Sequence, residues 1–218
     1  MKTGEPESPV NSRAGSGSAV EIPLLPQLST VVCRMMRDKG WTAQYNADAR
    51  VKALYSEKAG LLESLETSLG CVLRDDDGVF QPRSLAQVIF SDNEALKKVE
   101  ALVFPALLED FEAYRKENAG AEVIIFESAT ILEKPRFDGF GDVTVLVDAP
   151  LQTRLERACE RDKASVEAVQ ARMANQPLMN SLSQGKNDPR VDFVLENTSG
   201  LAELESKVEE LMLNIHKQ

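Results

Sequence analysis

The sequence predicts an α/β protein built on a three-layer, doubly wound parallel sheet with helices on both faces. The run VTVLV at 143–147 is almost continuously apolar and β-branched, which is typical of a strand buried on both faces. Asp148, Ala149 and Pro150 close this strand and open a helix. Strand-like and helix-like segments alternate along 218 residues, of which 43% are hydrophobic, so one substantial core is expected.

The other elements follow from apolar periodicity and from the glycine, proline and aspartate residues between the periodic segments. Residues 1–20 are rich in Gly, Pro, Ser and charge and are predicted to be disordered, so the domain is expected at 21–218. Within it we expect a helical insert at about 49–118 and a helical lid at about 150–176. The expected helices are 29–39, 49–69, 83–90, 93–117 and 201–216, and the other expected strands are 41–45, 123–126 and 193–195.

The composition argues against several classes of protein. A net charge of −10 argues against a nucleic-acid partner, because a phosphate backbone is held by basic surface. No apolar run approaches the length that spans a bilayer, and the N-terminus lacks the apolar segment of a signal peptide, so no membrane partner is expected. Cys33, Cys71 and Cys159 are odd in number and lack metal-ligand spacing, which suits a reducing cytoplasm.

Three arginines recur on one face of the predicted lid helix. Arg154, Arg157 and Arg161 stand at positions i, i+3 and i+7, so their guanidinium groups project to the same side and could hold phosphate. The alternative is a solvated face on which Glu156 and Glu160 accompany the arginines, and the spacing alone favours this alternative.

Seven motifs resemble those of dephospho-CoA kinases, in the order in which that family has them, from Ser29 almost to the end of the chain. One of them, Asn46-Ala47-Asp48, has asparagine where the family has its first aspartate. The others are Ser29-Thr30-Val31, DGVFQPRSLAQVIF at 77–90, FESATILEK at 126–134, VLVDAPLQTRLERACERD at 145–162, ARMANQ at 171–176 and FVLENTSG at 193–200.

The resemblance implies a sheet of the P-loop kinase type with a helical substrate-binding insert and a helical lid. It also implies an activity, the transfer of the γ-phosphoryl group of ATP to the ribose 3′-hydroxyl of dephospho-CoA, which is the last step of coenzyme A biosynthesis. The expected partners are therefore ATP, with Mg²⁺ as the metal ion, and dephospho-CoA. We expect a monomer or a weak homo-oligomer.

By the same resemblance, Asp48 matches the catalytic aspartate of the family. It would contact the acceptor and either accept the hydroxyl proton or hold a magnesium-bound water. The alternative is that Asp48 caps the helix expected from Ala49. Arg157 and Arg161 match the lid arginines that bind ATP, with Arg157 also catalytic, and Gln176 ends the lid segment.

Further site residues come from the same comparison of motifs. Ser29 and Thr30 match the end of the family's phosphate loop, so both are expected to bind ATP and Ser29 to bind the metal ion. Asn197 matches the asparagine near the adenine, and its alternative is an ordinary polar turn after a strand. Glu127 and Ser128 follow a buried strand and are expected to face the acceptor.

The segment before Ser29 departs from the family. Counting back without a gap gives EIPLLPQLST at 21–30, where the family has a glycine-rich loop with a lysine. Leu28 takes the lysine position, and Pro23 and Pro26 have no N–H to donate to phosphate. A smaller departure is Phe104, which stands where the family has histidine.

Two hypotheses follow from these departures. The first is an active dephospho-CoA kinase whose loop is weakened or whose N-terminal sequence is incorrectly assigned. The second is a non-catalytic relative that binds a nucleotide, a CoA-like ligand or a protein partner. Because Asp48, Arg157 and Arg161 are retained, we favour the first.

Overall fold

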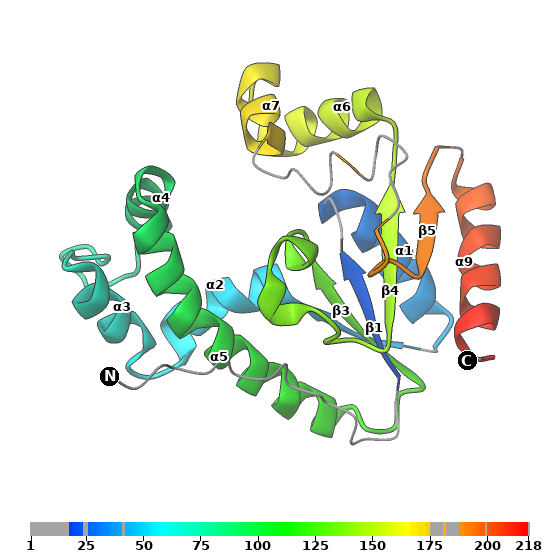
Figure 1. Ribbon diagram of the computed structural model, residues 1–218, viewed down its shortest axis with the longest axis horizontal. Coiled ribbons are helices and arrows are strands. Elements are labelled where there is room, and N and C mark those ends of the chain that lie inside the picture. Colours follow the sequence, from blue (N-terminus) through cyan, green and yellow to red (C-terminus); the bar gives the residue numbers. More distant parts are fainter. Residues whose placement is uncertain are drawn as a thin grey trace. The chain divides into compact units, whose positions relative to one another are not determined.

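A computed structural model describes residues 18–23, 26–40, 42–174, 181, 188–198 and 200–217 (Figure 1). The chain divides into two units. The first unit is Met1–Gln44 with Asn118–Gln218, and the second is Tyr45–Glu117. No described helix is both long and apolar enough to cross a membrane.

A five-stranded sheet with the strand order β2-β3-β1-β4-β5 organises the first unit. Strand β1 pairs in parallel with β3 and with β4, and β4 pairs in parallel with β5. These pairings confirm the predicted parallel sheet, and β3 and β4 extend slightly beyond their predicted ends. The strands are β1 (Ser18–Pro23), β2 (Thr42–Asn46), β3 (Val123–Ser128), β4 (Val143–Asp148) and β5 (Phe193–Glu196).

Strand β1 corrects the prediction that residues 1–20 are disordered. Ser18, Ala19 and Val20 belong to this strand, and the rest of that segment lies outside the described residues. The register pairs Ser18 with Val123 at one end and Pro23 with Ser128 at the other. Because β1 has a hydrogen-bonded neighbour on each side, pairing can hold a short segment whose composition alone does not predict a strand.

Helices α1 (Pro26–Asp38) and α9 (Leu201–Ile215) pack on one face of this sheet. Helix α1 begins three residues earlier than predicted, and a proline suits the first turn of a helix because its missing N–H would have no partner there. The shared core is apolar and almost completely buried: Val32, Cys33 and Met36 from α1, Val123, Ile125, Val143, Val145, Val147 and Leu195 from the sheet, and Leu204, Val208, Leu211, Met212 and Ile215 from α9.

Aromatic side chains cover the opposite face of the sheet. Side chains alternate along a strand, so Phe126 lies on the face opposite to that of Ile125. The ring centroids of Phe126 and Phe140 are 5.0 Å apart, and those of Phe137 and Phe140 are 5.6 Å apart. Two short 3₁₀ turns, η1 (Ile131–Glu133) and η2 (Pro135–Phe137), carry the chain past this cluster.

Arg190 ties these turns to the segment that enters β5. Its Nη1 donates to the Leu132 carbonyl oxygen at 3.0 Å and to Asp138 at 2.8 Å, while Nε and Nη2 both donate to Asp188. The neighbouring carboxylates raise the pKa of Arg190 further above its already high ordinary value. Four hydrogen bonds to one guanidinium group therefore fix the loop between β3 and β4 relative to the start of β5.

The second unit consists of four helices, and one of them corrects a prediction. The prediction of one long helix at 49–69 is wrong, because one helix ends at Glu57 and the next begins at Leu61. Gly60 adopts a φ of 78°, a left-handed conformation that glycine adopts without strain and that interrupts a helix. The helices predicted at 83–90 and 93–117 are confirmed. The four are α2 (Ala47–Glu57), α3 (Leu61–Leu69), α4 (Pro82–Ser91) and α5 (Asn93–Glu117).

Candidate functional site

Polar residues gather at the carboxyl edge of the parallel sheet in the first unit. Strand β3 ends with Glu127 and Ser128, which are 3% and 7% exposed, and β4 ends with the half-buried Asp148. Asn197 directly follows β5, is 7% exposed, and donates its backbone N–H to the Asp148 carbonyl oxygen at 2.8 Å. Because ligands of open α/β sheets bind outside this edge, Glu127, Ser128 and Asn197 lie where a site is expected.

A hydrogen bond from the neighbouring strand β2 fixes the side chain of Glu127. Its Oε2 accepts a hydrogen bond of 2.7 Å from the Gln44 side chain of β2. Burial, and then the negative charge of Glu127, raises the pKa of the Cys33 thiol well above its ordinary value. Cys33 is therefore a protonated, inert core residue.

Helix α6 (Leu151–Asp162) starts directly beyond β4 and carries the predicted arginines. The alternative of a solvated arginine face is wrong for Arg154, which is only 5% exposed. Its Nε lies 4.0 Å from Oδ1 of Asp148, and neither of these two buried atoms has a hydrogen-bond partner among the described residues. Burial raises the pKa of Asp148 above its ordinary value. The sequence pattern singled out Arg154 by its spacing but gave no sign of this burial.

The structure shows less about the other two predicted arginines of α6, Arg157 and Arg161. Arg157 is half-buried, and Arg161 belongs to the same helix with its side chain outside the described residues. On the exposed side, the Gln152 amide donates to Glu156 at 2.7 Å. Helix α6 packs on α7 (Val166–Ala174) through Leu155, Val169 and Met173.

Ser29 and Thr30 belong to α1, which follows the carboxyl end of β1. Their side chains lie outside the described residues, as does the whole of Gln176. Backbone placement alone therefore puts Ser29 and Thr30 near the start of a helix that leaves the carboxyl edge of the sheet.

Asp48 lies in the second unit, on the exposed surface of the first turn of α2. The alternative that it caps a helix starting at Ala49 is wrong, because α2 starts at Ala47 and Asn46 is its N-cap. The Asn46 side-chain oxygen accepts the Ala49 N–H at 2.8 Å. Asn46 thus takes the capping role that asparagine fills well, and the Asp48 carboxylate is a favourable charge in the first turn.

A partly buried network that the sequence did not reveal fixes the helix that carries Asp48. Arg50 of α2 donates from Nε and Nη2 to the two carboxylate oxygens of Asp110 on α5, at 2.9 and 2.8 Å. The Tyr45 hydroxyl donates to the same carboxylate at 2.6 Å. Burial raises the pKa of Tyr45, and Arg50 holds the pKa of Asp110 below its ordinary value. Sixty residues separate Arg50 from Asp110, so no local sequence signal could have paired them.

The Asp110→Asn variant is expected to unfold more easily, by about 1–3 kcal/mol near neutral pH, because Arg50 loses its charged acceptor. Since the pKa of Asp110 is lowered, this contribution is complete above the ordinary value of 3.8 and is lost as the pH falls through the folded-state pKa. Urea unfolding at several pH values should therefore show the difference between wild type and variant shrinking below pH 3.8. The exposed Asp76→Asn is the control, and a difference independent of pH would contradict the pairing.

Comparison with known proteins shows where this chain belongs. A family model described as dephospho-CoA kinase matches residues 29–203. The chain is a member of the dephospho-CoA kinase family. The dephospho-CoA kinase of Salinibacter ruber is 30% identical over 184 residues, which are 84% of this chain and 89% of that protein. That of Porphyromonas gingivalis is 32% identical over 162 residues, which are 74% of this chain and 78% of that protein.

Solved structures agree on the fold. TT1252 from Thermus thermophilus superposes with a TM-score of 0.75 and 25% identity, covering 92% of this chain and 98% of that one. The dephospho-CoA kinase from Campylobacter jejuni superposes with a TM-score of 0.58 over 91% of this chain and 96% of that one, at 19% identity. The predicted α/β fold of the P-loop kinase type is thus confirmed.

The family match begins at Ser29, directly after the segment that lacks a phosphate loop. The structure nevertheless places the end of strand β1, which finishes at Pro23, and the start of helix α1, which begins at Pro26, within that segment. The dephospho-CoA kinase fold is therefore retained around a sequence without the loop's glycines and lysine.

A metal ion would not need a preformed protein cage in a dephospho-CoA kinase. Among the residues that the structure describes, no group of three or more His, Cys, Asp or Glu side chains could hold a metal ion. Mg²⁺ in kinases usually keeps several waters and takes one or two carboxylates together with the substrate phosphates. The exposed carboxylate of Asp48 fits that donor set.

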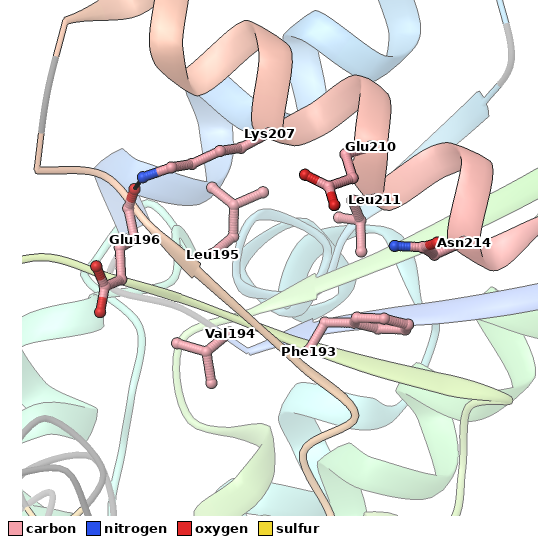
Figure 2. Close-up of a pocket in the computed structure, with 8 residues that line it drawn as sticks. All are labelled: Phe193, Val194, Leu195, Glu196, Lys207, Glu210, Leu211 and Asn214. Carbon is pink, nitrogen blue, oxygen red and sulfur yellow. Dashed lines mark hydrogen bonds between the residues drawn. The ribbon is translucent and has the colours of Figure 1, made fainter.

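A groove of about 340 Å³ lies between β5 and α9 (Figure 2). Val194 and Glu196 line it from the strand, and Lys207 and Asn214 line it from the helix. Lys207 donates to the Glu196 carbonyl oxygen at 3.1 Å and pairs with Glu203 at 2.9 Å. The lining includes none of the predicted site residues, so the groove is separate from the carboxyl-edge cluster.

Proposed function

We propose that this protein transfers the γ-phosphoryl group of ATP to the ribose 3′-hydroxyl of dephospho-CoA, the last step of coenzyme A biosynthesis. The observation that carries the proposal is the family match over residues 29–203, which includes the predicted catalytic positions. The relatives named above are all kinases, except for TT1252, whose name states no activity. No finding favours the alternative of an inactive subunit.

Each predicted residue has a task in this reaction. Asp48 orients the 3′-hydroxyl and accepts its proton, and its exposed carboxylate suits contact with a substrate. Arg157 and Arg161 neutralise charge on the transferred group, while α6 and α7 act as the lid. Ser29 and Thr30 contact the phosphates, and Asn197 contacts the adenine.

The remaining groups complete the proposal. Glu127 and Ser128 face the acceptor, and the second unit, Tyr45–Glu117, acts as the substrate-binding insert. Mg²⁺ would be held by Ser29, and when bound it neutralises phosphate charge. We place the reaction in the cytoplasm and expect a monomer or a weak homo-oligomer.

The test is ADP release by the purified protein with magnesium-ATP, with and without dephospho-CoA. Coenzyme A is the matched control acceptor, because its 3′-hydroxyl already carries phosphate. We expect release that depends on dephospho-CoA and that coenzyme A does not support. A folded protein that releases no ADP under these conditions would contradict the proposal and favour a non-catalytic relative.

A further inference from the structure

We propose that Arg154 supplies the buried positive charge that binds the phosphate groups of the nucleotide, in place of the lysine that this chain lacks. The inference rests on the proposed function, since it assigns a further residue to the same nucleotide site. The observation behind it is that the guanidinium group of Arg154 is buried, while its Nε–H has no acceptor among the described residues.

The burial of Arg154 is unusual for its residue type. Its side chain is only 3% exposed, although arginine is rarely buried unless it is fully paired. The distance of 4.0 Å from Nε to Asp148 Oδ1 is too long for a hydrogen bond of normal length. Among the described residues, the Nε–H therefore has no acceptor, although a buried donor of this kind calls for one.

Arg154 also lies just beyond the strand that neighbours β1, the strand that leads to the phosphate-binding position. It stands in the first turn of α6, where its backbone N–H donates to the Pro150 carbonyl oxygen at 3.0 Å. Helix α6 leaves the carboxyl end of β4, and β4 pairs directly with β1, with Val20 opposite Val143. In α/β nucleotide-binding folds the phosphates bind beyond such a strand, at the start of the helix that follows it.

The sequence between β1 and α1 provides no cation for the phosphate-binding position. Between Glu21 and Thr30 there is no lysine or arginine, and Leu28 occupies the lysine position of the family's loop. A guanidinium group is always charged and presents several N–H donors in a planar fork, which suits phosphate oxygens. Asp148 balances this charge while no nucleotide is bound, and burial raises the pKa of its carboxyl group above the ordinary value.

The experiment compares ligands with and without phosphate. Titration calorimetry would measure the binding of ATP, inorganic tripolyphosphate and adenosine to wild type and to Arg154→Gln. We expect the variant to lose roughly ten- to hundredfold in affinity for ATP and for tripolyphosphate, and none for adenosine. A purely structural role would lower the affinities for all three ligands alike, or lower none of them.

Two further variants keep the test valid if Arg154→Gln folds poorly. Asp148→Asn with Arg154→Gln removes both charges, so the site stays neutral, and it should fold and still lose affinity for ATP and tripolyphosphate. Leu28→Lys added to Arg154→Gln should restore part of that affinity, because it returns a cation to the loop position. Full ATP affinity in the neutral double variant would overturn the inference.

ADP release in the same preparations separates this inference from the proposed function. If wild type shows release that depends on dephospho-CoA while Arg154→Gln keeps its affinity for tripolyphosphate, the role of Arg154 is wrong and the proposed function stands. If folded wild type neither binds ATP nor releases ADP, both are wrong.

Discussion

The Asp48→Asn variant is expected to lose roughly 10²- to 10⁴-fold in the rate of phosphoryl transfer, the range that removal of a general base gives. Asparagine keeps the size of the side chain but cannot accept the proton of the 3′-hydroxyl. The fold should survive, because Asp48 is exposed and Asn46 rather than Asp48 caps α2. The loss of a first-turn carboxylate should cost less than about 1 kcal/mol of stability.

The measurement is kcat for ADP release with saturating dephospho-CoA, together with urea unfolding. Asp76→Asn is the matched control, since it also neutralises an exposed carboxylate of the second unit. It should leave kcat unchanged. Unchanged turnover in Asp48→Asn would remove this residue from its catalytic role.

The Arg157→Ala variant is expected to lower kcat by roughly 10²- to 10³-fold, with a smaller effect on KM for ATP, because its charge acts mainly on the transferred group. Arg157→Lys should restore only part of the rate, since an ammonium group cannot make two parallel hydrogen bonds to phosphate. Steady-state kinetics at varied ATP concentration would separate the two parameters.

Arg37→Gln is the control for Arg157. It removes an exposed arginine from the last turn of α1, away from the helix start at the carboxyl edge of the sheet. If Arg157→Ala changes KM for ATP without changing kcat, Arg157 binds the nucleotide and does not stabilise the transition state.

The strongest strands could be predicted because composition and burial agree in them. Val143–Val147 and Val123–Phe126 are apolar runs, and all of these positions are buried in the structure. Strand β1 could not be predicted, because pairing with β3 and β4 defines it and its sequence follows a long polar segment. The break at Gly60 was missed because apolar periodicity continues on both sides of that glycine.

In the candidate site, too, local motifs predicted some residues, while contacts that depend on the fold could not be predicted. Glu127, Ser128 and Asn197 were predicted from motifs, and strand ends place them at one edge of the sheet. The pairing of Arg154 with Asp148 depends on how α6 leaves β4, and spacing along one helix cannot show which arginine turns inward. The packing of α6 against the end of β4, and not the spacing of the arginines, therefore determines which arginine is buried.

The contact between Lys207 and the last carbonyl of β5 bears on how this edge of the sheet is protected from pairing with a strand of another chain. The outermost strand of a sheet presents unpaired backbone groups that can recruit a strand from another chain. Here that strand has only four residues, and a lysine ammonium group already occupies one of its carbonyl oxygens. With Val194 59% exposed on this strand, the short length and the charged cover act against sheet extension and fibrous aggregation at this side of the molecule.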